Sequence, residues 1–374
     1  MPEIKIPQEL IPQDARFGCG PSRMRLEQLQ AFATAGAKLM GTSHRQAPIK
    51  NLVAEIQNGL LELFGNPSGY EIALGNGGST AFWDVAAYSL AEGPSQALVH
   101  GEFGAKFASA LAAPFLDKPE VIQAEAGSRK DLIGRAGIKT YVYPQNETST
   151  GVIAPVKRVA ADADAIFLTD ATSAAGGIAF DALETDVYYF APQKNFASDG
   201  GLWLALLSPQ AIERVEKIAK SDRYIPEFLS LKIALDNSRL NQTLNTPALA
   251  TLFLLNEQVK YINSSGGLSW ADQQTRKASA LLGDWVRKTS YVDFFVKDES
   301  QRSQVVVTMD FAENIDAAEI VKVLRQNGIV DTDPYRKLGK NQMRVATFVN
   351  SDLADLEKLT KAIEYVVERL WCAG

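Results

Sequence analysis

Residues 165–207 have the sequence AIFLTDATSAAGGIAFDALETDVYYFAPQKNFASDGGLWLALL, in which three short apolar runs stand out. The runs, at 165–169, 187–191 and 202–207, are rich in β-branched and aromatic residues and do not alternate strictly with polar ones. This pattern is typical of strands that are covered on both faces. About ten residues separate the last two runs, which is short for a crossover helix, so we expect this pair to be antiparallel.

Earlier apolar runs extend the pattern towards the N-terminus, with helical patterns between them, at 71–75, 96–100, 120–124 and 140–143. With the first three they make seven candidate strands. Strands that alternate with helices predict an α/β fold, here a large three-layer domain around a mostly parallel, seven-stranded mixed sheet.

The second half of the chain has a different pattern. Residues 210–290 are helical in periodicity, and residues 303–311 (SQVVVTMDF) begin a new series of strands and helices. This change predicts a smaller C-terminal α+β domain. We place the large domain at 16–256 and the small domain at 257–374. Three prolines in the first 15 residues indicate an extended arm at 1–15, which we expect to pack nearby.

The composition excludes several classes of function. The 374 residues carry a formal net charge of −6, so no broad basic field exists that would bind nucleic acid. No apolar stretch is long enough to span a membrane. The two cysteines, Cys19 and Cys372, cannot form a disulfide framework, which predicts a cytoplasmic protein. With only two histidines we expect no histidine-based metal site, and we predict no bound metal.

Two charged residues follow predicted strands. Lys194 comes three residues after the run 187–191 ends, where desolvating an ammonium is costly, and a Schiff base would remove that charge. Asp170 directly follows the run 165–169. Because strand ends in open α/β sheets converge on one crevice, both side chains can reach one ligand. Pyridoxal phosphate (PLP) needs such a lysine and such an acid. Alternatively, Lys194 emerges into solvent and Asp170 caps a helix.

Three further features lie after predicted strands. The turn Gly75-Asn76-Gly77-Gly78-Ser79-Thr80 opens a helix, where backbone N–H groups favour an anion, or alternatively it is only a tight turn. Phe103 could stack on a flat cofactor or belong to the core. The segment 146–151 (NETSTG) offers hydroxyl groups, or is a polar loop. Together these features point to one site at a sheet edge.

This combination resembles the class V, fold-type I aminotransferases, which are PLP enzymes. The shared order is NETSTG, an aspartate that ends a strand, and Gln193-Lys194 after an apolar strand. Further motifs resemble the phosphoserine aminotransferases of that family: FxxGP at 17–21, SHR at 43–45 and NTP at 245–247. The resemblance extends from about residue 16 to the C-terminus.

The resemblance implies a role for each matching residue. Lys194 would form the Schiff base and move the substrate's α-proton, and Asp170 would pair with the pyridine nitrogen. The other implied cofactor contacts are Gly78, Ser79, Phe103, Thr148 and Gln193. Asn245 and Thr246 are implied to reach the cofactor phosphate of a neighbouring subunit, so a homodimer is expected.

The implied substrate residues are cationic. His44, Arg45 and Arg344 match residues that hold the anionic substrate, and Arg336 is a further candidate. Some positions depart from better-known family members: Ser79 stands for an arginine, Phe103 for a tryptophan, Cys19 for a serine, and Tyr335-Arg336-Lys337 lies near the place of a His-Arg pair. These departures leave the residues of the phosphate clamp open.

The implied activity is transamination between glutamate or 2-oxoglutarate and 3-phosphohydroxypyruvate or O-phosphoserine in serine biosynthesis. Whether the related phospho-hydroxythreonine step of PLP synthesis is also catalysed stays open. One alternative is an enzyme of the same fold that uses alanine or serine with glyoxylate or pyruvate. A cysteine desulfurase needs a mobile-loop cysteine, which Cys19 and Cys372 do not provide. Another alternative is a non-enzymatic PLP-binding regulator, although no helix-turn-helix arm precedes the domain.

Overall fold

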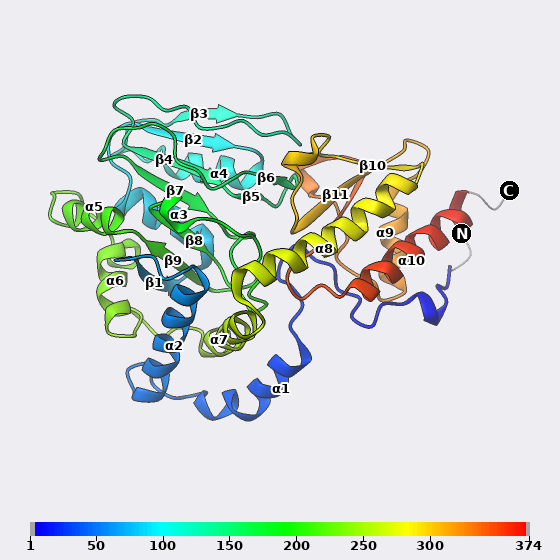
Figure 1. Cartoon of the computed structure of the whole chain (residues 1–374), viewed down its shortest axis with the longest axis horizontal. Coiled ribbons are helices and arrows are strands. Elements are labelled where there is room, and N and C mark those ends of the chain that lie inside the picture. Colours follow the sequence, from blue (N-terminus) through cyan, green and yellow to red (C-terminus); the bar gives the residue numbers. More distant parts are fainter. Residues whose placement is uncertain (1–3, 372–374) are drawn as a thin grey trace.

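A computed structural model describes residues 4–371 of the chain. One part is built on a seven-stranded sheet and the other on a three-stranded sheet, and helix α8 (Gly267–Lys288) runs from the first part to the second (Figure 1). Cys372 lies outside the described residues. No helix among residues 4–371 has the length and apolar character that crossing a bilayer requires.

The large sheet contains all seven predicted strands, with ends that differ from the prediction by at most one residue. They are β1 (Glu71–Asn76), β2 (Ser95–Val99), β3 (Glu120–Gln123), β4 (Thr140–Pro144), β7 (Ile166–Asp170), β8 (Val187–Phe190) and β9 (Leu202–Leu207). Their order is β1-β9-β8-β7-β4-β2-β3. β9 is antiparallel to both neighbours, and the other pairs are parallel. The predicted mixed sheet and the antiparallel pair are therefore confirmed.

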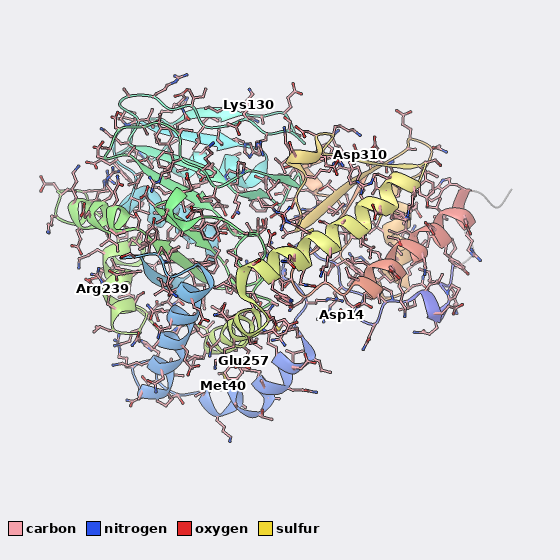
Figure 2. All side chains as sticks on the ribbon, in the orientation of Figure 1. Asp14, Met40, Lys130, Arg239, Glu257 and Asp310 are labelled. Atoms are coloured by element: carbon pink, nitrogen blue, oxygen red, sulfur yellow. The ribbon has the colours of Figure 1, made fainter. Side chains whose placement is uncertain are left out.

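Helices cover both faces of this sheet, as the apolar character of its strands requires. Along β8, Tyr188 and Phe190 pack in one core and Val187 and Tyr189 in another, because successive side chains of a strand point to opposite faces. The first core lies under α2 (Ala47–Leu63) and α7 (Leu249–Ser264), and the second under α3 (Gly78–Ser89) and α4 (Glu102–Ala110). Side chains fill the space between these layers (Figure 2). The three-layer prediction is confirmed.

The remaining helices flank these layers or build the smaller part. They are α1 (Leu26–Thr34), α5 (Pro209–Ala219), α6 (Leu231–Arg239), α9 (Ala317–Gln326) and α10 (Leu353–Trp371). Short 3-10 helices are η1 (Gln8–Leu10), η2 (Gly36–Leu39), η3 (Ala182–Glu184), η4 (Glu227–Leu229), η5 (Glu299–Gln301) and η6 (Arg336–Leu338).

The smaller part has an antiparallel sheet of β10 (Val292–Phe294), β11 (Val306–Phe311) and β12 (Gln342–Ala346). Its core joins this sheet to α8, α9 and α10, and Ile6 and Phe17 from the N-terminal segment are buried in it. Helix α8 is shared, since Ala271 packs in the core of the large sheet and Leu282 in that of the small one. The division of the chain at 256/257 remains a proposal.

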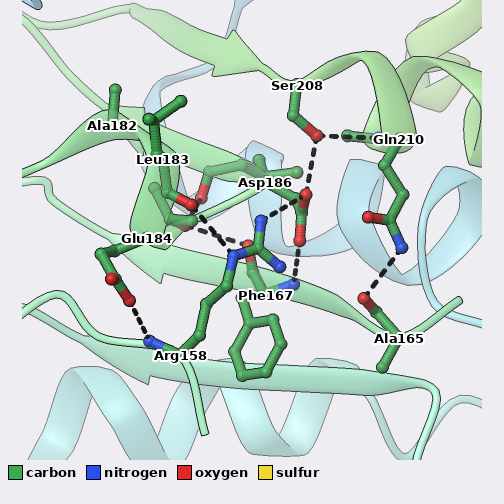
Figure 3. A network of polar contacts seen from close by, with 12 residues as sticks. Arg158, Ala165, Phe167, Ala182, Leu183, Glu184, Asp186, Ser208 and Gln210 are labelled. Carbon is green, nitrogen blue, oxygen red and sulfur yellow. Dashed lines mark hydrogen bonds and ion pairs between the residues drawn. The ribbon is translucent and has the colours of Figure 1, made fainter. Parts of the chain in front are cut away.

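Two polar features were not predicted as structural elements. The segment NETSTG contains β5 (Asn146–Glu147) and the turn of a hairpin whose second strand is β6 (Val152–Ile153). At the amino-terminal ends of β7 and β8, the buried Asp186 accepts hydrogen bonds from Arg158 Nη2 (2.7 Å), Ser208 Oγ (2.7 Å) and Phe167 N (2.8 Å) (Figure 3). Arg158 and Asp186 also form an ion pair, so this carboxylate is fully partnered within the protein.

Candidate active site

The carboxyl-terminal ends of four adjacent parallel strands meet at one edge of the large sheet. Phe103 follows β2, Thr148 follows β4, Asp170 ends β7 and Lys194 follows β8. A cavity of about 240 Å³ lies there. Its lining is Gly77, Gly78, Ser79, Thr80, Trp83, Phe103, Asn146, Thr148, Asp170, Thr172, Ser173, Gln193, Lys194 and Gly201. All the cofactor residues predicted within one subunit are in this set.

Lys194 is held against the N-terminal segment. Its Nζ donates to the carbonyl of Cys19 (2.5 Å), and Gly20 has a φ of +128°. A Cβ on Gly20 would lie 2.0 Å from that Nζ, so a larger residue would displace the lysine side chain, and the positive φ itself favours glycine. Ser22 fixes the backbone beside it, donating from Oγ to the Lys194 carbonyl (2.6 Å). The FxxGP motif therefore builds one wall of the lysine's site.

Burial lowers the pKa of Lys194 to about 8, and the charge of Arg344 acts in the same direction. Part of the side chain still faces the cavity. A lower pKa leaves more of the lysine as free amine near neutral pH, and the free amine is the form that attacks a carbonyl. The lysine is thus prepared for covalent chemistry with a ligand in the cavity.

Asp170 is buried and hydrogen-bonded but has no cationic partner. Its Oδ1 accepts from Thr172 N (2.9 Å) and Thr172 Oγ1 (2.6 Å), and its Oδ2 accepts from Trp83 Nε1 (3.3 Å). No lysine, arginine or histidine among residues 4–371 forms an ion pair with it. A buried carboxylate of this kind suits a ligand that brings a positive N–H group.

The glycine-rich turn joins β1 to α3 as predicted. Gly77 is the N-cap residue with a φ of +113°, and no side chain caps the helix. Ser79 and Thr80 therefore lie inside the helix and not at its cap. Gly78, Ser79 and Thr80 form the first turn of α3 and line the cavity. Since the first N–H groups of a helix have no partner within it, they offer a place for a phosphate.

The NETSTG hairpin positions two sides of the cavity. The buried carboxylate of Glu147 accepts from Gly104 N (3.0 Å) and Phe103 N (3.4 Å), and Ser149 Oγ accepts from Glu102 N (3.0 Å). The hairpin therefore caps α4, the helix that carries Phe103, and also carries Thr148 itself. Burial raises the pKa of Glu147, although these hydrogen bonds act against that shift.

Unpartnered polar atoms gather around the cavity. Asn146 Oδ1, Gln193 Oε1 and Arg344 Nε are buried without a hydrogen-bond partner. Because buried polar atoms are almost always satisfied, these three indicate a polar ligand. A lysine, a carboxylate without a cation, a helix N-terminus and an aromatic ring together fit PLP. No group of three or more acidic, histidine or cysteine residues in 4–371 is placed to hold a metal ion.

Comparisons with known proteins agree with this geometry. Residues 25–332 match the sequence profile of the family described as aminotransferase class-V. The chain belongs to that family. A phosphoserine aminotransferase of Rhodococcus jostii (strain RHA1) is 52% identical over 366 residues, which cover 98% of each chain. The predicted resemblance to phosphoserine aminotransferases is thereby confirmed, and the chain is an enzyme.

Solved structures show the same fold. A phosphoserine aminotransferase of Cytophaga hutchinsonii aligns with a TM-score of 0.86 at 23% identity, over 95% of this chain and 99% of that one. An alanine–glyoxylate aminotransferase of Nostoc sp. aligns with a TM-score of 0.79 at 18% identity, over 97% and 98%. The fold is therefore shared by aminotransferases with different substrates and does not select one.

In this class V aminotransferase, the predicted substrate residues fall into two groups. Arg344, in β12, lies beside the cavity and donates from Nη1 to the carbonyl of Thr148 (2.8 Å). Arg336 begins η6 and is exposed, and the next residue, Lys337, forms an ion pair with Glu102. Arg344 is thus close to the cofactor residues, whereas Arg336 faces solvent.

The second group lies outside the cavity lining. Thr246 Oγ1 is 3.3 Å from His44 Nδ1, Arg45 Nη1 donates to Gln242 (2.8 Å), and Asn245 Oδ1 accepts from Asn76 Nδ2 (2.7 Å). The SHR and NTP motifs therefore meet on one surface of the aminotransferase, next to the residue that ends β1. Arg45, Asn245 and Thr246 are exposed there.

Sequence reasoning missed several residues of the site. Trp83, Thr172 and Ser173 line the cavity but were not singled out, and Asn146 was noted only as part of NETSTG. Trp83 sits in a helical apolar pattern that is typical of a core residue. Asn146 could have been found, since it lies three positions after the apolar run 140–143 and two positions before Thr148.

Proposed function

We propose that this aminotransferase exchanges an amino group between glutamate and 3-phosphohydroxypyruvate, giving 2-oxoglutarate and O-phosphoserine, as a step of serine biosynthesis. The observation that carries the proposal is the cavity in which Lys194, Asp170 and the N-terminus of α3 face one space, with Arg344 beside it. The 52% identity to a relative named phosphoserine aminotransferase supports the choice of substrate.

Different residues of the cavity would bind different groups of PLP. Lys194 would bind it covalently and afterwards carry the proton at the substrate α-carbon, and Asp170 would hold the proton of the ring nitrogen. The phosphate would lie at the N-terminus of α3, with Gly78, Ser79 and Gln193. Phe103 would lie against the ring, and Thr148 near its phenolic oxygen. When bound, PLP supplies a carbonyl for the amine and a ring that accepts electrons.

The substrate and the subunits complete the proposal. Arg344, whose Nε is buried without a partner, would bind the α-carboxylate that both substrates share. We further propose a homodimer in which Asn245 and Thr246 reach the neighbouring site, with His44 and Arg45 on the same surface. That surface is exposed in the single chain, which supports a subunit contact. A cytoplasmic location, from the two cysteines, is part of the same proposal.

A coupled assay tests the substrate. The purified holoenzyme is given glutamate with 3-phosphohydroxypyruvate, glyoxylate or pyruvate in turn, and alanine replaces glutamate in a parallel series. We expect the highest kcat/KM for glutamate with 3-phosphohydroxypyruvate. A preference for alanine with glyoxylate would assign the alternative activity. No turnover with any of these pairs, despite bound PLP, would show that the enzyme's substrates lie outside this set.

A further inference from the structure

Tyr335 lies between two residues of the proposed active site. Its ring centroid is 6.0 Å from that of Phe103, in an edge-to-face arrangement. The guanidinium carbon of Arg344 lies 5.2 Å from the same Tyr335 centroid. One half-buried ring therefore contacts both the aromatic residue of the cofactor cavity and the arginine beside it.

Few other groups hold the Arg344 guanidinium. Nη1 donates to the Thr148 carbonyl, Nε is buried without a partner, and no carboxylate in residues 4–371 forms an ion pair with it. Arg158, in contrast, is fixed by the Asp186 carboxylate and by the Leu183 carbonyl. An arginine side chain has many rotamers, so one carbonyl alone does not fix its direction.

The segment that carries Tyr335 contacts α4, the helix that carries Phe103. Lys337, two residues later in η6, forms an ion pair with Glu102, the residue before Phe103. Two consecutive residues of α4 therefore contact this segment, one through charge and one through its ring. These contacts hold the Tyr335 ring at a fixed place against Phe103.

We infer that Tyr335 is a positioning residue for Arg344, an inference that rests on the proposed function. The face of an aromatic ring attracts a guanidinium without using its N–H groups. Tyr335 and the Thr148 carbonyl thus orient Arg344 and leave Nε and Nη2 free for a carboxylate. Since the same ring contacts Phe103, the carboxylate site and the cofactor ring are set at a fixed position relative to each other.

Binding of glutarate to the PLP-loaded enzyme, measured by isothermal titration calorimetry, tests the inference without turnover, because glutarate has two carboxylates and no amino group. We expect Tyr335→Ala and Tyr335→Leu to weaken glutarate binding roughly 2- to 30-fold, the range of a guanidinium–ring interaction. Tyr335→Phe keeps the ring and should bind as the wild type does. Tyr365→Ala is the matched control, since it removes a ring that stacks on Arg369 in α10.

The possible outcomes distinguish a failure of the Tyr335 inference from a failure of the proposed function. Normal glutarate binding by Tyr335→Ala and Tyr335→Leu, with weak binding by Arg344→Ala, would overturn the inference and leave the proposed function standing. Normal binding by Arg344→Ala would remove the proposed role of Arg344 itself. If Tyr335→Phe binds as weakly as Tyr335→Ala, the hydroxyl contacts the ligand and the positioning role is wrong. Thermal unfolding of each holoenzyme identifies any variant whose loss is a general loss of fold.

Discussion

The two ends of the large sheet each contain a buried aspartate, and the two differ in their partners. At the amino-terminal end, Asp186 pairs with Arg158 and accepts from Ser208 and a backbone N–H (Figure 3). At the carboxyl-terminal end, Asp170 accepts from Thr172 and Trp83 but has no ion pair within residues 4–371. Asp186 is neutralised by the protein, whereas Asp170 faces a cavity.

The same contrast holds for the cationic residues. Lys139, which precedes β4 at the amino-terminal end, forms ion pairs with Asp162 (3.0 Å) and Asp164 (2.8 Å). Lys194 and Arg344 at the other end form none with the described residues. A buried charge that loses its ionic partner destabilises the fold, whereas charges without partners around a cavity are available to a ligand. For the two aspartates and for Lys139, Lys194 and Arg344, the number of ionic partners therefore distinguishes the amino-terminal end of the sheet from the end that carries the cavity.

The largest effect is expected at Lys194. Lys194→Ala should abolish transamination, because no other lysine among residues 4–371 lines the cavity. Lys139→Ala, which removes a lysine with two ionic partners, should keep turnover near that of the wild type. Borohydride reduction of the yellow holoenzyme followed by peptide mapping should label Lys194. A label on another lysine would contradict the assignment of Lys194 as the residue that binds PLP.

The two aspartates should respond to the same substitution in opposite ways. Asp170→Asn should bind PLP but lose turnover about 10²- to 10⁴-fold, since an amide cannot hold the proton of the ring nitrogen. Asp186→Asn should keep turnover and lose about 1–3 kcal/mol of unfolding free energy, because it leaves Arg158 without its carboxylate. Steady-state kinetics and chemical denaturation of both variants check this. The reverse pattern would show that partner count does not distinguish the two ends.

A smaller effect should separate the two substrate arginines. Arg344→Ala should weaken glutamate and phosphoserine alike, about 10- to 150-fold for a lost charged hydrogen-bonded contact, because both present an α-carboxylate. Arg45→Ala should weaken the phosphate-bearing substrate more, so it should change the ratio of the two kcat/KM values. If both variants leave that ratio unchanged, the phosphate clamp lies elsewhere, with Arg336 and Lys337 to be tested next. If Arg344 alone changes it, the two roles are reversed.

Local patterns were sufficient to predict the sheet and the floor of the cavity. Each strand corresponds to a short apolar run in the sequence. The position after such a run was enough to identify four residues of the cavity: Phe103, Thr148, Asp170 and Lys194. Their meeting follows from a general property of parallel sheets, so no contact had to be known in advance.

The other parts of the site depend on contacts between distant segments, which a local pattern does not contain. A larger residue at position 20 would displace a lysine 174 residues later, and His44 contacts Thr246, which lies 202 positions later. The Tyr335 ring packs against Phe103, which belongs to the part of the molecule built on the large sheet. For the SHR and NTP motifs, the family resemblance implied which roles the residues have. It did not imply that the two motifs lie side by side within one chain.

The contact between the Gly20 segment and Lys194 also determines when the site can be completed during protein synthesis. The backbone just before Gly20 is held by residues that are translated after the whole large sheet, since Phe17 N donates to Val330 O (3.1 Å) and Ala346 N donates to Phe17 O (3.0 Å). A ribosome-bound chain that has already released its whole seven-stranded sheet still lacks these anchors. The lysine's pocket is therefore finished only after Ala346 has emerged.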